Sequence, residues 1–234
     1  MFTFSDPHHF RKTMAGLCMM AAPLLILIGM VVHPERKSDE GAQLAVAAAN
    51  LDQWFVAHAL LLAGIVLAAP AVLGLMHMLR EREVAWGHIG GGLAMLGLFA
   101  LTGLVAIDGL VVWQMAASGD SATMTALYER FTDTAGIFIP VYLLSFAFAL
   151  GMIGLCMGLY MARAVQVWMA AFIEIGVVCL AISGPVASGW LAIVGAAFLF
   201  VGLGSVGRMV LAESDEDWMH TPERTDFRAL PGMR

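Results

Sequence analysis

The sequence predicts an all-α integral membrane protein with six transmembrane helices in one bundle. Of its 234 residues, 60% are hydrophobic and only 13% are charged, whereas an ordinary soluble domain has about 45–50% and 25%. The mean hydropathy is +0.84. Because so few charged residues cannot cover a water-soluble surface, lipid must solvate much of the protein. Apolar segments also recur along the chain at about the 20-residue length that crosses a bilayer.

The predicted spans divide the chain into a membrane domain, residues 1–212, and a polar C-terminal tail, residues 213–234. They are expected at residues 13–32, 52–79, 86–117, 136–162, 166–182 and 188–211. The first span has no small-residue cleavage site after it, so it is interpreted as a retained anchor and not a signal peptide. Asp52 is positioned to cap the second span, and the prolines at positions 23 and 70 predict kinks within the first two.

The third span begins with several glycines, of which Gly87 and Gly91 have the spacing of a small-xxx-small helix contact. Between spans, residues 41–49 are expected to form a short helix. Residues 121–131 place Met124, Leu127 and Tyr128 on one helical face, which predicts an amphipathic helix on the membrane surface.

The distribution of basic residues predicts that both termini are cytoplasmic, in a plasma or inner membrane. With six spans, three basic residues fall outside, and nine fall inside, as the positive-inside rule requires. The outer ones are Arg36, Lys37 and Arg130; the inner ones are Arg11, Lys12, Arg80, Arg82, Arg163, Arg208, Arg224, Arg228 and Arg234. The net charge of −6 argues against a nucleic-acid partner.

Two titratable residues in the second and third spans are the main functional candidates. Trp54 and Trp113 have the character of membrane-interface aromatics, and His58 and Asp108 lie four or five positions deeper. If these spans are antiparallel neighbours, His58 and Asp108 lie at one depth. An intramembrane carboxylate costs about 2.5–3.5 kcal/mol and usually has a partner. The pair can hold a proton, orient a ligand or base, or only fix how two helices pack.

Glu174, near the middle of the fifth span, is the most deeply placed acid. A proton or cation relay would use such a residue, with Tyr142 or Ser145 beside it. The alternative is a protonated carboxyl that is hydrogen-bonded to a neighbouring carbonyl, because burial raises the pKa of a carboxyl group.

His33, at the outer end of the first span, could join His58 and Asp108 as the third ligand of a zinc or copper site. No HxxxH or HExxH spacing supports such a site, so the sequence ranks it below helix packing. No cofactor is identified. The fourth, fifth and sixth spans have no histidine for a bis-histidine haem, and no lysine lies within a span to hold retinal.

The sequence leaves three functions open. The first is a non-enzymatic accessory or structural subunit, with other membrane subunits or further copies of the chain as partners. The second is a small transporter or proton pathway that uses Asp108, Glu174 and His58. The third, least supported by sequence, is a metal-binding protein or enzyme at His58, Asp108 and His33. A transporter requires a cavity that reaches Asp108 or Glu174, whereas an enzyme requires three or more polar side chains around one opening.

Overall fold

The computed structural model describes residues 7–133 and 138–221. Within them the chain forms helices and connecting loops, with no strand. The elements are α1 (Pro7–Val32), α2 (Glu40–Ala49), α3 (Leu51–Met78), α4 (Val84–Ala106), the π-helical turn η1 (Ile107–Val111), α5 (Val112–Ala117), α6 (Ser121–Thr132), α7 (Phe138–Met161), α8 (Val167–Ser183), α9 (Gly189–Ala212) and the 3₁₀ turn η2 (Asp217–Met219). The predicted start of the fourth span, at residues 136 and 137, lies outside the described residues.

Five helical stretches are long and apolar enough to cross a membrane. They are Pro7–Val32, Leu51–Met78, Val84–Ala117, Ile139–Met161 and Gly189–Ala212. The sixth apolar helix, α8, has 17 residues and is shorter than the others. The first helix begins at Pro7, six residues before its predicted start, because the lead segment around His9 and Lys12 is held against the C-terminal segment.

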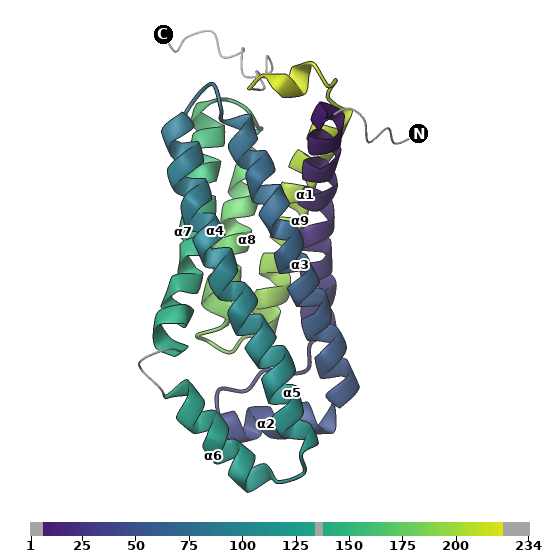
Figure 1. Cartoon of the computed structure of the whole chain (residues 1–234), viewed down its shortest axis with the longest axis vertical. Coiled ribbons are helices and arrows are strands. Elements are labelled where there is room, and N and C mark those ends of the chain that lie inside the picture. Colours follow the sequence, from purple (N-terminus) through teal and green to yellow (C-terminus); the bar gives the residue numbers. More distant parts are fainter. Residues whose placement is uncertain (1–6, 134–137, 222–234) are drawn as a thin grey trace.

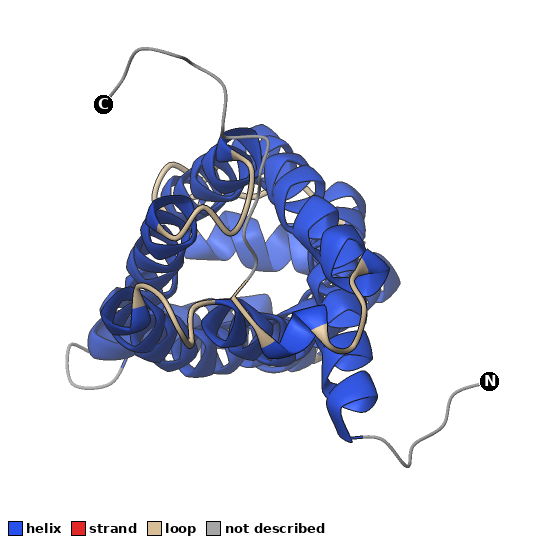
Figure 2. Cartoon of the chain, turned by 90° about the horizontal axis from the view of Figure 1, so that it is seen from above, coloured by secondary structure: helices blue, strands red, loops and turns tan. Residues whose placement is uncertain are grey.

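The long helices lie side by side, and α2 and α6 cross one end of the bundle (Figure 1). Seen end-on, the helices form a closed ring (Figure 2). The main neighbours are α1 with α3 and α9, α4 with α7, and α8 with α9. The beginning of α1 and the turn η2 lie together at the end opposite α2 and α6 (Figure 1).

Small residues set the closest helix contacts. A Cβ atom on Gly90 would lie 2.7 Å from the main-chain nitrogen of Leu155, so α4 and α7 pack nearly backbone to backbone. Gly97 and Gly151 extend this contact. Gly87 and Gly91, the predicted contact pair, instead face side chains of the α3 end, Leu79 and Met76. The glycine-rich start of α4 therefore packs closely against both α3 and α7.

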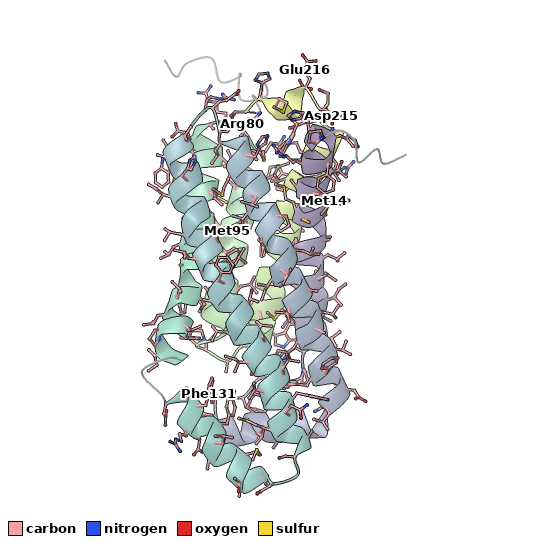
Figure 3. The ribbon with its side chains drawn as sticks, viewed as in Figure 1. Met14, Arg80, Met95, Phe131, Asp215 and Glu216 are labelled. Atoms are coloured by element: carbon pink, nitrogen blue, oxygen red, sulfur yellow. The ribbon has the colours of Figure 1, made fainter. Side chains whose placement is uncertain are left out.

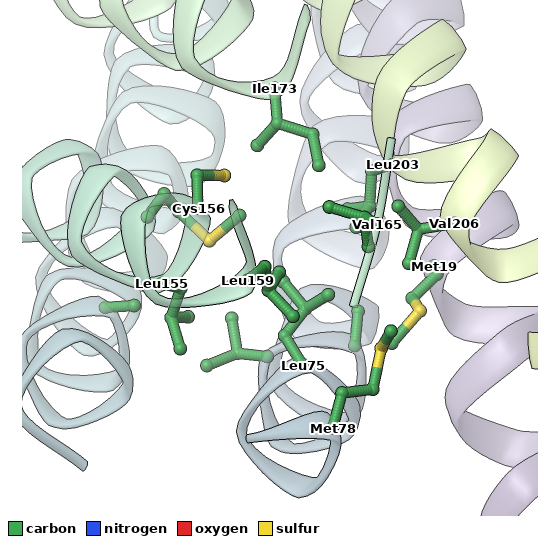
Figure 4. Close-up of a cluster of buried hydrophobic side chains, with 14 of the residues drawn as sticks. Met19, Leu75, Met78, Leu155, Cys156, Leu159, Val165, Ile173, Leu203 and Val206 are labelled. Carbon is green, nitrogen blue, oxygen red and sulfur yellow. The ribbon is translucent and has the colours of Figure 1, made fainter. Parts of the chain in front are cut away.

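The apolar core lies in the half of the bundle nearer η2. Met19, Leu75, Leu155, Ile173 and Val206 come from five different helices and are buried together (Figure 4). Their contacts explain why α8, although short, is held within the bundle.

The first part of the predicted polar tail is docked on the bundle. Trp218 is only 2% exposed, and its carbonyl accepts a hydrogen bond from the Arg80 side chain. Asp215 forms an ion pair with Lys12, and Thr221 donates its main-chain N–H to Glu81. Arg80 and Asp215 lie at this end of the bundle, whereas Phe131 marks the opposite end (Figure 3). The remaining tail, residues 222–234, lies outside the described residues.

Candidate metal centre

The predicted contact between the second and third spans is present at the end of the bundle near α2 and α6. His58 of α3 and Asp108 of η1 approach with 3.1 Å between Nε2 and Oδ2. The histidine side chain is 5% exposed, whereas that of Asp108 is 44% exposed. Asp108 therefore has one side against the histidine and the other toward open space.

A π-helical turn places Asp108 opposite the histidine. The α4 helix changes to η1 at Ile107, and such single-turn insertions are frequent at functional sites. Gly109 follows Asp108 and packs against His58, where a Cβ atom would lie 2.6 Å from the histidine Cβ. The absence of a side chain at this position lets the two helices bring the imidazole and the carboxylate together.

Trp54 is part of this site and is not a lipid-facing interface residue, which corrects the sequence interpretation. It is completely buried, and its indole Nε1 donates a hydrogen bond to the main-chain carbonyl of Asp108 at 3.1 Å. Its ring stacks on His58 with centroids 4.7 Å apart. The sequence could have indicated this contact, because Trp54 and His58 are four positions apart and residues at i and i+4 lie on the same face of a helix.

His33 joins the pair from the end of α1. Its ring centroid lies 4.9 Å from that of His58. The Nδ1 atom lies 2.6 Å from the carbonyl of Pro34, to which it can donate a hydrogen bond, while Nε2 is buried without any hydrogen-bond partner. Burial, reinforced by the nearby Arg36 charge, lowers the pKa of His33 to about 4. The ring is therefore neutral near pH 7, and its buried Nε2 has a free lone pair.

The contacts of His58 require an extra proton or a cation. Its Nδ1 lies 2.8 Å from the carbonyl of Trp54, and its Nε2 faces the Asp108 carboxylate. A neutral imidazole has only one N–H, so both contacts are hydrogen bonds only if the ring is positively charged or Asp108 is protonated. A metal ion at Nε2 would replace that proton.

The three side chains have the donor set of a transition-metal site. One ligand atom from each of His33, His58 and Asp108 lies within 4.8 Å of the others. Ligands around a tetrahedral zinc ion are about 3.4 Å apart, so binding requires closure by at most about 1.4 Å. In both histidines Nδ1 faces a main-chain carbonyl, the usual second contact of a metal-binding imidazole.

The exposed side of Asp108 faces a cavity of about 330 Å³ near α2 and α6. His33, Arg36, Tyr128 and Tyr142 also line it. Arg36 and Tyr128 were not identified from the sequence as site residues. Arg36 lies three positions after His33 in a connecting loop, and Tyr128 belongs to the amphipathic helix, whose apolar face turns toward the cavity and not only toward lipid.

Glu174 and Tyr142 are not brought together. Tyr142 and Ser145 of α7 line a second cavity that also contains Asp108 and His58, whereas Glu174 lines neither of the two cavities that contain Asp108. Glu174 lies on α8 with Cys156 of α7 as an electrostatic neighbour. The structure thus separates the two acidic candidates into different surroundings.

Comparison of the chain with protein-family models, with curated proteins and with solved structures gives no match. The function is therefore inferred from the geometry of this site.

Proposed function

We propose that this chain is a six-span membrane protein that binds one divalent transition-metal ion through His33, His58 and Asp108. The observation that carries the proposal is the buried Nε2 of His33, which has no hydrogen-bond partner in a ring that lies beside His58 and groups with Asp108. Leaving a buried polar atom without a partner costs about 1–3 kcal/mol, and a metal ion removes that cost. Two histidines and one carboxylate suit zinc, which is the first ion to test.

In this proposal α8 is the sixth span, both termini are cytoplasmic, and the metal centre lies near the outer face of a plasma or inner membrane. The basic residues predicted to be outside, including Arg36 and Arg130, lie at the end of the bundle that carries α2 and α6.

The geometry favours this function over the accessory subunit that the sequence ranks first. A subunit that uses His58 and Asp108 only for packing would bury both, whereas the Asp108 side chain is 44% exposed and lines a cavity with His33, Arg36 and Tyr128. More than three polar side chains surround that cavity. A zinc ion with three protein ligands retains a fourth position for water or substrate, which allows hydrolytic or Lewis-acid chemistry in the cavity.

The test is metal analysis combined with native mass spectrometry on the detergent-extracted protein. We expect one zinc ion per chain after exposure to zinc and dialysis. His33→Ala and Asp108→Asn should each weaken zinc binding more than about 100-fold, because even second contacts of metal ligands are worth 10–100-fold. His88→Ala is the control, since His88 is exposed at the other end of the bundle.

The proposal would be overturned if the wild-type protein bound no zinc at millimolar concentrations of the ion. Equal zinc content in the His33 and His88 variants would overturn it as well. Folding of each variant is checked by its thermal transition in metal-free buffer. An accessory or structural role would then again be the better explanation of the His58–Asp108 contact.

A further inference from the structure

The cavity at the metal centre continues into a second, apolar cavity of about 210 Å³ between the helices. Six residues line both cavities, so the two meet at one junction: Arg36, Leu104, Val105, Asp108, Tyr142 and Gly184. The polar cavity opens toward α2 and α6, and the apolar one extends inward between α3, α4, α7, α8 and α9.

The apolar cavity has the lining and the length to hold a hydrocarbon chain. Its lining reaches from Asp108 to Leu98, ten positions away along the same helical stretch, or about 15 Å. Beyond the junction the lining is almost entirely aliphatic and aromatic, and its only charged residues are Arg36 and Asp108 at one end. His58, Tyr142, Ser145 and Ser183 add the remaining polar side chains.

Arg36 supplies a positive charge at the junction, where it is attracted by Asp108 but is not in an ion pair with it. Among the described residues its only hydrogen bond is to the sulfur of Met30 at 3.5 Å, and no carboxylate oxygen lies within the 4.0 Å of an ion pair. A guanidinium has five N–H donors with the geometry to bind a carboxylate or phosphate. The neighbouring Lys37, in contrast, is already paired with Glu35.

We propose that the joined cavities bind a single-chain amphiphile, with its anionic carboxylate or phosphate group at Arg36 and its hydrocarbon chain in the apolar cavity. This deepens the proposed function and rests on it for the metal ion beside the head group. With a divalent ion at the three ligands, the junction carries net positive charge, because Asp108 supplies the only negative charge among the residues that line it. An anionic head group can then bridge the ion and the guanidinium.

The test is native mass spectrometry of the zinc-loaded protein in an eight-carbon, non-ionic detergent, with dodecanoate, dodecyl phosphate and dodecanol as probes. We expect one dodecanoate or dodecyl phosphate per chain, and weaker binding of dodecanol. Arg36→Gln should lower the affinity for the anionic probe by about tenfold or more and leave zinc content unchanged. Arg208→Gln, at an exposed position near the opposite end of the bundle, is the control and should change neither.

The length of the apolar cavity is tested separately with Ala149→Leu, which fills it about 10 Å inward of Tyr142 on the same helix. This variant should lose dodecanoate binding but keep hexanoate binding, whereas Leu150→Phe, on the exposed side of α7, should change neither.

Dodecanol binding as tight as dodecanoate, or dodecanoate affinity equal in Arg36→Gln and wild-type protein, would overturn the inference. Zinc binding distinguishes the two failures. If the protein binds zinc but no amphiphile, only the metal site remains supported. If dodecanoate binds in an Arg36-dependent way but zinc does not bind, only the amphiphile site remains supported.

Discussion

The indole of Trp54 donates a hydrogen bond to the main-chain carbonyl of Asp108, across the interface between α3 and η1. Next to this contact, the main-chain N–H of Val112 donates to the carbonyl of Ile107, five residues earlier, whereas an α-helix would use the carbonyl four residues earlier. The tryptophan therefore braces the irregular turn at the residue whose carboxylate faces His58. One side chain thus fixes both the imidazole, by stacking, and the acid, through its backbone.

We expect Trp54→Phe to weaken zinc binding by about 10-fold, because it removes the brace and retains most of the stacking surface. The free energy of unfolding should fall by about 1 kcal/mol for the lost hydrogen bond. Zinc titration and thermal unfolding measure the two effects. Trp113→Phe is the matched control, since the Trp113 Nε1 is buried without a partner and no hydrogen bond is lost. Equal effects of the two substitutions would refute the bracing role.

Gly109→Ala should distort the metal centre. The added Cβ would lie 2.6 Å from the Cβ of His58, so α3 and η1 must move apart. Overpacking of this kind costs about 1–3 kcal/mol, and zinc affinity should fall with it. Gly103→Ala, on the same helical stretch, meets no atom within 4 Å and should leave both quantities unchanged or slightly raise stability. Thermal unfolding and zinc titration of both variants provide the comparison.

Docking of residues 213–221 should weaken as the pH rises from 4.5 to 8. Burial, together with the nearby Asp217 charge, raises the pKa of Glu213 from 4.5 to about 7. The folded state therefore holds this proton more tightly than the unfolded state. The resulting stabilisation is present below pH 4.5 and is lost as the pH rises through 7.

Glu213→Gln removes the charge at all pH values and should stabilise the protein by about 1–2 kcal/mol at pH 8, after allowance for solvent screening, but have little effect at pH 4.5. Thermal unfolding at the two pH values measures the difference. The control is Glu216→Gln, at an exposed position in the same segment. A Glu213→Gln effect of equal size at both pH values would contradict the titration argument.

The proposed topology can be checked by cysteine labelling. In a variant whose three native cysteines, Cys18, Cys156 and Cys179, are replaced, a cysteine at Ser38 should react with a membrane-impermeant maleimide in intact cells. A cysteine at Glu216 should react only after the cells are opened, because the basic residues around it favour the cytoplasm. Both positions are exposed, so reactivity reports the side of the membrane. The reverse labelling pattern would invert the topology.

Hydropathy and periodicity were sufficient to predict the helices. The length of each apolar segment and the spacing of the face formed by Met124, Leu127 and Tyr128 are local properties, so α2, α6 and the long helices could be located before any contact was known. The contact between His58 and Asp108 was also predictable, because their depths are set by position along two adjacent helices.

The remaining features depend on contacts between distant segments. Local sequence could not show that a buried tryptophan, at residue 54, braces Asp108, or that Trp218 anchors the beginning of the tail, because a tryptophan near an apolar boundary suits a lipid interface equally well. Sequence alone determined an apolar, helical chain with a few polar groups inside its apolar segments. Only tertiary packing decided that His33 completes the group with its Nε2 unpartnered, and that Arg36 lies at the junction of two cavities, since loops have no fixed depth until the helices around them are placed.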